Sequence, residues 1–329
     1  MGSYIVRRLV AMLGMMVALS MIVFLLFTAL PADPARLVCG KACTPAIITA
    51  INHKYGLDQP LPTQYGAFVK GIFVGRTYGE DKAAFDCKVP CLGYSFNRNE
   101  DVSVLIKDSF PITAQVALGG FVLWIVVGVG IGIIAALRRG RWQDRTIMGI
   151  ALAGYSFPSF FIALLLVFFI QIKLAWLGFH SYVPIYENPG EWFKSLILPW
   201  IAIAILYAAF YSRLTRNQML ETLGEDYIRT ARAKGLRERT VIGKHALRAG
   251  LTPIVTAAGL DLAGLFGGAI IIETVFALPG MGRLSVDSVL TSDLPIITGT
   301  VLVAAFFIIL ANLVVDLLYA VIDPRVRLT

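Results

Sequence analysis

Charged residues are scarce in this sequence. Asp, Glu, Lys and Arg make up 15% of the 329 residues, whereas an average soluble domain has about 25%. Hydrophobic residues make up 57% and come in long stretches. Disordered and collagen-like chains do not have this composition, and a soluble domain of this length could not bury so much apolar surface. We therefore expect an all-α membrane protein that crosses the bilayer several times.

Residues that commonly carry catalysis are also few. The three histidines are His53, His180 and His245; none lies in an apolar stretch and no H-E-x-x-H sequence occurs, which excludes an intramembrane zinc protease of that type. No G-x-x-x-x-G-K-[ST] sequence occurs, so we expect no P-loop nucleotide site. Gly154–Pro158 begins like a serine nucleophile elbow but lacks its last glycine, and Ser156 is expected to be a helix-packing residue. We expect no catalytic residue, no metal and no cofactor bound by this chain.

Six apolar stretches are candidates for membrane-spanning helices, each of which needs about 20 apolar residues. They are Leu9–Leu30, Ile112–Leu137, Ile147–Ile172, Leu196–Tyr211, Leu251–Ile272 and Ile296–Ile322. The fourth is short and would have to thin the bilayer or pack inside the helix bundle. The first is longer than the apolar region of a cleaved signal peptide, which has about 7–15 residues, so we interpret it as a retained helix.

The positions of Lys and Arg predict the orientation of the spans, because cytoplasmic loops carry an excess of these residues. With the N-terminus in the cytoplasm, 17 of the 29 fall in inside segments and three in the two short outside loops. Both termini are therefore expected to be cytoplasmic, and the basic surplus does not indicate a nucleic-acid partner.

The other nine Lys and Arg residues lie in the outside segment Pro31–Asp108. Its helix-like stretches Thr44–Tyr55 and Thr63–Phe73 predict a small ordered insertion.

All four cysteines lie in that outside segment. They stand as two C-x3-C sequences, the first with Cys39 and Cys43 and the second with Cys87 and Cys91. An even number of cysteines on the oxidising side of a membrane indicates two disulfides, for which three connectivities are possible. A four-cysteine metal or iron–sulfur site is one alternative, although its thiolates would face an oxidising compartment, and free thiols are the other.

The expected cytoplasmic loop Arg213–Arg248 carries a helical pattern. One apolar stripe is predicted by four residues at helical spacing, namely Leu220, Leu223, Tyr227 and Ala231. Gly235 follows where a glycine commonly ends a helix, and a second short helix is expected over Glu238–Leu247. An amphipathic helix lying on anionic lipid is one interpretation. A helical hairpin that docks on a cytoplasmic protein is the other.

Two acidic residues, Asp261 and Asp316, lie within expected spans. An ionisable residue in a span usually has a function, because burying it unpaired is costly. Asp316 is near the expected cytoplasmic end, where it could pair with a neighbouring helix or reach water. Asp261 is in mid-span near several glycines, which indicates a tight helix contact or a cavity wall. For Asp261, lining a translocation path and structural pairing both stay open.

The loop sequence DYIRTARAKGL over Asp226–Leu236 is followed by His245–Arg248 and by Thr252–Pro253. This arrangement resembles the cytoplasmic signature loop of ABC-importer permeases and, more narrowly, that of the dipeptide and oligopeptide permeases. The general motif reads E-A-A-x3-G-x9-I-x-L-P. Arg229–Ala231 stands at E-A-A and Gly235 at the glycine. The differences at the Glu, Ile and Pro positions fit the variant of the peptide family.

The resemblance extends over nearly the whole chain. In the family's order it includes the sequences Leu30–Pro34, Tyr55–Pro60, Gly93–Ser95, Glu273–Arg283 and Asp323–Arg325. The segment Arg76–Leu92 departs from the family and looks like an insertion that brings Cys87 and Cys91. Because Cys39 and Cys43 are also unusual for the family, we hypothesise that bridges join this insertion to the segment after the first span.

The resemblance implies an importer-type permease fold with three parts. These are a first span within residues 1–30, an extracytoplasmic insertion over 31–108, and a permease core over 109–329 with the coupling loop 213–250. The chain would be a non-catalytic subunit that forms half of a path for peptides or similar solutes across a prokaryotic cell membrane. Expected partners are a second homologous permease subunit, two ATP-binding subunits, an extracytoplasmic solute-binding protein and membrane lipid. ATP and Mg²⁺ would bind to the ATPase subunits.

The resemblance also implies roles for particular residues. Coupling to the ATPase is expected of Tyr227, Ile228, Arg229, Thr230, Ala231, Arg232, Ala233, Lys234, Gly235 and Leu236. An outer gate or a contact with the binding protein is expected of Glu273, Phe276, Pro279, Gly280 and Gly282. The alternative is a secondary transporter or channel that uses Asp261 and Asp316 as ion or proton sites, although no inverted repeat with broken helices is obvious.

Overall fold

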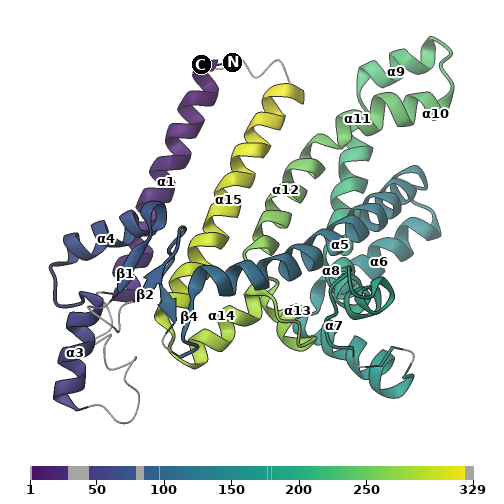
Figure 1. Ribbon diagram of the computed structural model, residues 1–329. Coiled ribbons are helices and arrows are strands. Elements are labelled where there is room, and N and C mark those ends of the chain that lie inside the picture. The colour runs from purple at the N-terminus through teal and green to yellow at the C-terminus, as the bar shows by residue number, and fades with distance from the viewer. Residues whose placement is uncertain are drawn as a thin grey trace. The chain divides into compact units, whose positions relative to one another are not determined.

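The computed structural model describes residues 2–28, 44–78, 85–95, 97–175, 177–178 and 180–322. Within these ranges the chain is mostly helical, with a few short strands (Figure 1). It divides into two compact units, each built from segments that are distant in sequence. One unit comprises Met1–Thr113, Phe266–Ile270 and Pro279–Leu313; the other comprises Ala114–Leu265, Ile271–Leu278 and Val314–Thr329.

Four helices in the described ranges are long and apolar enough to cross a membrane. They are α1 (Gly2–Thr28), α5 (Val102–Leu137), α8 (Pro189–Leu223) and α15 (Leu294–Ile322). Two bent helix pairs raise the number of spans to six if each pair is one span. The six apolar stretches of the sequence correspond to these four helices and two pairs.

The third apolar stretch is divided between two helices. α6 (Trp142–Ser156) ends before Phe157, and α7 (Ser159–Leu166) continues into the π-helix η3 (Val167–Lys173). The two parts meet at 101°. Proline explains the break, because Pro158 has no amide hydrogen to donate and holds the residue before it in an extended conformation.

The fifth apolar stretch is also interrupted. It begins with the short helices α10 (Glu238–Thr240), η4 (Val241–Ala246) and α11 (Leu247–Gly250), which meet α12 (Thr252–Phe266) at 49°. The expected span Leu251–Ile272 stops at Phe266. Gly268 has φ +120°, which only glycine adopts readily, and α13 (Ile270–Val275) starts after it.

The fourth apolar stretch, Leu196–Tyr211, is part of a longer helix. α8 has 35 residues, so it needs no local thinning of the bilayer, and much of it is buried among the described residues, which agrees with the alternative of packing inside the helix bundle. Its first turn is fixed by Asn188, whose Oδ1 accepts hydrogen bonds from the N–H groups of Gly190 and Glu191 at 3.0 and 3.2 Å. The helix then continues past Arg213 through polar residues, which a hydropathy reading does not count as part of a span.

Glycines on α5 allow close contact with α8. A Cβ added at Gly119 would lie 2.1 Å from the Trp200 ring, and one at Gly128 would lie 3.0 Å from the backbone of Ala208. At Gly132 the added Cβ would lie 2.6 Å from the carbonyl oxygen of Ser212. Small residues at such positions let helix backbones approach in membrane proteins. These three glycines therefore fix how closely α5 and α8 pack.

Two helices lie in the segment after the first span, as the sequence predicts. α3 (Pro45–Tyr55) has Thr44 as its N-cap, and α4 (Leu61–Val74) follows a turn. α4 packs on α1 through Tyr65, whose hydroxyl is 2.9 Å from the Ser20 hydroxyl and whose ring centre is 5.4 Å from that of Phe24. The expected ordered helices of this segment are therefore confirmed.

Two short antiparallel hairpins follow. β1 (Arg76–Tyr78) pairs with β2 (Phe85–Cys87), and β3 (Tyr94–Ser95) pairs with β4 (Glu100–Asp101). The second hairpin is tied to the segment between α14 (Met281–Leu290) and α15. The Ser95 hydroxyl donates to Asp293 at 2.5 Å, and both residues are buried.

The disulfide in the described part of the chain joins Cys87 to Cys91. The hypothesis that these two cysteines are bridged to the segment after the first span is therefore wrong. A turn after β2 brings their Cα atoms to 5.4 Å, within the range that a disulfide requires, and the bridge is buried against Tyr78. Cys39 and Cys43 lie outside the described residues.

We expect Gly132→Ala to destabilise the protein, because its added methyl group meets the backbone of α8. Overpacking of this kind costs about 1–3 kcal/mol. Gly130→Ala is the matched control on the same helix, since nothing lies within 4 Å of a Cβ there; it should be neutral or stabilising by up to about 1 kcal/mol. Thermal melting of the detergent-purified protein measures both. A Gly132→Ala protein that melts at or above the wild-type temperature would contradict the packing.

The disulfide can be tested by mass spectrometry of a non-reduced tryptic digest. Trypsin cleaves after Lys88, so the Cys87 and Cys91 peptides should appear joined and separate on reduction. Linked peptides that combine Cys87 or Cys91 with Cys39 or Cys43 would show that the assigned pairing is incorrect.

Candidate functional site

The segment after α8 forms a helical hairpin, and its first feature is a sharp break. α8 ends at Leu223, and α9 begins at Asp226 and ends at Ala233 (Figure 1). The single helix predicted from the apolar stripe is therefore wrong. Gly224 has low helix propensity, and Glu225 is extended with ψ 147°, so the chain changes direction between the two halves of the stripe.

The end of α9 has the geometry that the sequence predicts. Gly235 has φ +75°, in the left-handed region that suits glycine. Its N–H donates to the Arg232 carbonyl at 2.9 Å, and the Leu236 N–H donates to the Ala231 carbonyl at 3.4 Å. These two bonds are those of a Schellman motif, which satisfies carbonyls that a helix end leaves free. The prediction that Gly235 ends this helix is confirmed.

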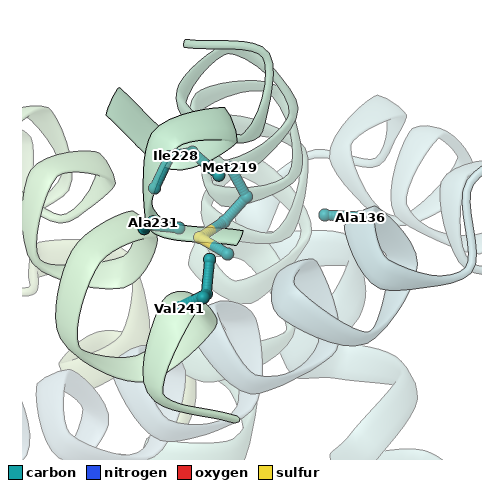
Figure 2. Close-up of a cluster of buried hydrophobic side chains, with 6 residues drawn as sticks. Ala136, Met219, Ile228, Ala231 and Val241 are labelled. Atoms are coloured by element: carbon teal, nitrogen blue, oxygen red, sulfur yellow. The ribbon is translucent and has the colours of Figure 1, made fainter. Parts of the chain in front are cut away.

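A buried apolar cluster holds α9 in the hairpin (Figure 2). Ile228 and Ala231 lie three residues apart on one face of α9 and point toward Met219 of α8. The cluster is completed by Ala136, Val241 and Ala246. Full burial of a side chain such as Ile228 contributes about 1.5–3 kcal/mol, so this face of α9 is occupied within the chain.

The other face of α9 is exposed. Tyr227 is 45% exposed, and Leu236, just beyond the helix, is 42% exposed. Arg229, Thr230, Arg232, Ala233 and Lys234 are exposed as well. Of the ten residues expected to couple, Ile228 and Ala231 anchor the helix and the remaining eight form an outward surface with large apolar and basic groups.

An ion pair joins α9 to the next helix. The Arg232 guanidinium donates two hydrogen bonds to Glu238 of α10, at 2.7 and 3.2 Å. These hydrogen bonds raise the pKa of Arg232 above its usual value. Because both side chains are about half exposed, solvent screens the pair and its contribution to stability is small. Its geometric effect is to restrict the angle between α9 and α10.

A second ion pair was not anticipated from the sequence. Arg216 of α8 donates two hydrogen bonds to Asp144 of α6, at 2.6 and 2.8 Å, and the Gly140 N–H donates to the same carboxylate at 2.9 Å. The Asp144 side chain is almost fully buried. Removing one partner of such a pair costs about 3–5 kcal/mol, so it fixes α6 beside α8. The only hint in the sequence was an acid among the basic residues of one loop.

The acid in the fifth span has a hydrogen-bond partner. The Tyr211 hydroxyl of α8 donates to Asp261 Oδ2 of α12 at 2.5 Å. Asp261 is partly exposed, whereas Tyr211 is fully buried. The backbone of Asp316 is part of α15, but its side chain lies outside the described residues.

The residues expected at an outer gate differ in exposure. Glu273 is fully buried in α13 and Phe276 is partly buried, whereas Pro279 is exposed. Gly280 and Gly282 are buried at the start of α14. A Cβ added at Gly268 would lie 2.8 Å from Gly282 Cα, so backbone meets backbone there. That the five residues expected at the outer gate contact a binding protein stays a prediction.

The described residues contain no group of three or more His, Cys, Asp or Glu side chains that could hold a metal ion. Cys87 and Cys91 are bonded to each other, so they do not supply thiolates for the four-cysteine metal site considered above. Around α9 the described residues form a short helix with one face buried in the chain and the other exposed.

Two family descriptions match the chain. Residues 128–328 match the family "Binding-protein-dependent transport system inner membrane component". Residues 1–117 match "Binding-prot-dependent transport system membrane comp, N-term". The first match covers more than half of the chain and includes α9 with the whole hairpin.

Relatives are similar over their full length. A putative peptide transport system permease protein of Brucella abortus (strain 2308) is 38% identical over 327 residues, 99% of each chain. The glutathione transport system permease protein GsiC of Escherichia coli (strain K12) is 37% identical over 327 residues, again 99% of each chain. In fold, the chain is similar to the MetNI methionine ABC transporter in an inward-facing conformation. That comparison has a TM-score of 0.53 at 18% identity and covers 67% of this chain and 97% of the other.

The apolar helices, the two family matches and the full-length relatives agree with one another. They describe a membrane protein with several spans, similar to permease subunits of transport systems. The chain therefore belongs to the family of binding-protein-dependent transport-system inner-membrane components, and within it to the peptide ABC-transporter permeases.

Proposed function

We propose that this chain is one of two membrane subunits of an ATP-driven importer and couples ATP hydrolysis to transport through α9. The observation that carries this proposal is the two-sided character of α9. Ile228 and Ala231 anchor its inner face in the apolar cluster, while Tyr227 and Leu236 are left exposed beside basic side chains. An exposed aromatic residue on an anchored helix is a typical anchor for a protein partner.

The partners follow from this proposal. Two ATP-binding subunits would receive α9 in a groove and would bind ATP and Mg²⁺, and a second homologous permease subunit would complete the path. An extracytoplasmic solute-binding protein would deliver the cargo, with Glu273–Gly282 and residues 31–108 on that side. The relatives' names favour peptides or similar small solutes such as glutathione as cargo. The chain itself would remain non-catalytic.

The proposal includes a topology in the cytoplasmic membrane of a prokaryote. Both termini and the hairpin would face the cytoplasm, where ATP is available, and the cysteines would face the oxidising side. The excess of Lys and Arg in the inside segments supports this orientation. Closure of the ATPases on ATP would displace α9, and the hairpin would pass that displacement to the spans and exchange inward- and outward-facing states.

We expect Tyr227→Asp to reduce the amount of ATPase that co-purifies with this chain by about tenfold or more, because it replaces an apolar anchor worth about 2 kcal/mol with a charge. Tyr186→Asp is the matched control. Tyr186 is 83% exposed and lies in the segment between η3 and α8, away from the hairpin in sequence. The measurement is quantitative co-purification from detergent, together with ATP hydrolysis by the purified complex.

The melting temperature separates loss of docking from loss of folding. Tyr227→Asp should leave it near the wild-type value, whereas Ile228→Asp puts a charge into the buried cluster and should lower it strongly. Equal ATPase yields from the Tyr227→Asp and Tyr186→Asp proteins would refute the assignment of α9. A chain that purifies alone and transports solute with an ion gradient would refute the importer proposal itself.

A further inference from the structure

The surroundings of Asp261 have features of a ligand site that coupling through α9 does not use. Within the described ranges the carboxylate accepts one hydrogen bond, from the neutral hydroxyl of Tyr211. Among the described residues Asp261 forms no ion pair, in contrast to Asp144 with its arginine. It is partly exposed on a helix that belongs to a candidate span. A carboxylate in such a position lacks a compensating cation.

Aromatic rings stand beside this carboxylate. Tyr207 lies one turn before Tyr211, the hydrogen-bond partner of Asp261, on the same side of α8. Trp124 of α5 stacks on the Tyr207 ring with 4.5 Å between centroids and 23° between planes, and its centroid is 6.2 Å from that of Tyr211. Trp124 and Tyr211 are fully buried, while Tyr207 and Asp261 are partly exposed. The two buried residues therefore hold the two accessible ones in place.

The combination of an anionic oxygen and a tyrosine ring is the chemistry that binds an organic cation. A carboxylate supplies charge and hydrogen-bond acceptors, and an aromatic face attracts an ammonium group through its quadrupole. A metal ion would need further oxygen ligands, and no group of three candidate ligands occurs in the described ranges. The site therefore favours an ammonium group over a metal.

We propose that Asp261 and Tyr207 bind the primary ammonium group of the transported solute, the free N-terminus of a peptide. Tyr211 and Trp124 are positioning residues: Tyr211 orients the carboxylate and Trp124 fixes the Tyr207 ring. This inference deepens the proposed transport of peptides and rests on it. A purely structural Asp261 would need only the bond from Tyr211, which an asparagine oxygen can accept equally well, and this difference allows a test.

The test uses photo-labelling of the membrane complex purified with its ATPases and without the binding protein. The probe is the tripeptide Ala-benzoylphenylalanine-Ala, with a free or an acetylated N-terminus, and the labelling of this chain is quantified. The free-amine probe should label the wild type about tenfold more than the acetylated one, because acetylation removes the positive charge that pairs with Asp261. Asp261→Asn should remove this preference.

Controls separate charge from shape. The same peptide with an amidated C-terminus keeps its ammonium group and should label as well as the free-amine probe. Asp261→Glu keeps the charge and should retain a preference for the free amine, although a weaker one. Glu187→Gln makes the same acid-to-amide change at an exposed residue outside the candidate spans and should behave as wild type.

Equal labelling of the wild type by the free and acetylated probes would overturn the inference, and so would a preference that persists in Asp261→Asn. The wild-type comparison is decisive even if Asp261→Asn does not assemble. ATP-dependent uptake of the free-amine peptide by the complete wild-type system in proteoliposomes tests the proposed function separately. Uptake without a labelling preference refutes only the ammonium site, whereas absence of uptake refutes peptide transport.

Discussion

The close contact between α5 and α8 is the constraint on which the rest of this half of the chain depends. Four glycines of α5 meet α8 at distances where an added Cβ would collide, namely Gly119, Gly120, Gly128 and Gly132. The Trp200 ring lies at Gly119 and the Ile203 side chain at Gly120. In a bilayer, where helix association gains little from hydrophobic burial, such packing is a main source of stability. It sets the position of α8, and α8 carries both Tyr211 at the intramembrane acid and Met219 at the hairpin.

Asp144 and Asp261, the two acids of this region, differ in how far their charge is compensated. Asp144 is buried and fully compensated, with a bidentate arginine and a backbone N–H, so it can hold α6 and α8 together without further partners. Among the residues that the structure describes, Asp261 has a single neutral donor, and it stays partly accessible. A buried pair that is complete serves structure, whereas an incomplete one within a span leaves charge available for a ligand. This contrast is why we assign a binding role to Asp261 and none to Asp144.

Sequence reasoning predicted the parts that depend on local pattern. The six apolar stretches, the helices α3 and α4 and the glycine end of α9 all follow from composition or from one residue's conformational preference. It did not predict contacts across long separations, such as Asp144 with Arg216, 72 positions apart. Sequence reasoning also predicted one helix through Gly224, because the apolar residues keep helical spacing on both sides of the turn. The pairing of Cys87 with Cys91 depends on a turn that spacing alone does not define.

α8 connects the two sites. Tyr207, Tyr211 and Met219 all lie on this one continuous helix. Met219 packs against α9 in the buried cluster, and Tyr211 bonds to Asp261. At 1.5 Å per residue these two positions are about 12 Å apart along the axis. A rigid helix cannot shift at one of them without shifting at the other. If an ATPase displaces α9, as we propose, α8 would carry the displacement from Met219 to Tyr211 and to its hydrogen bond with Asp261.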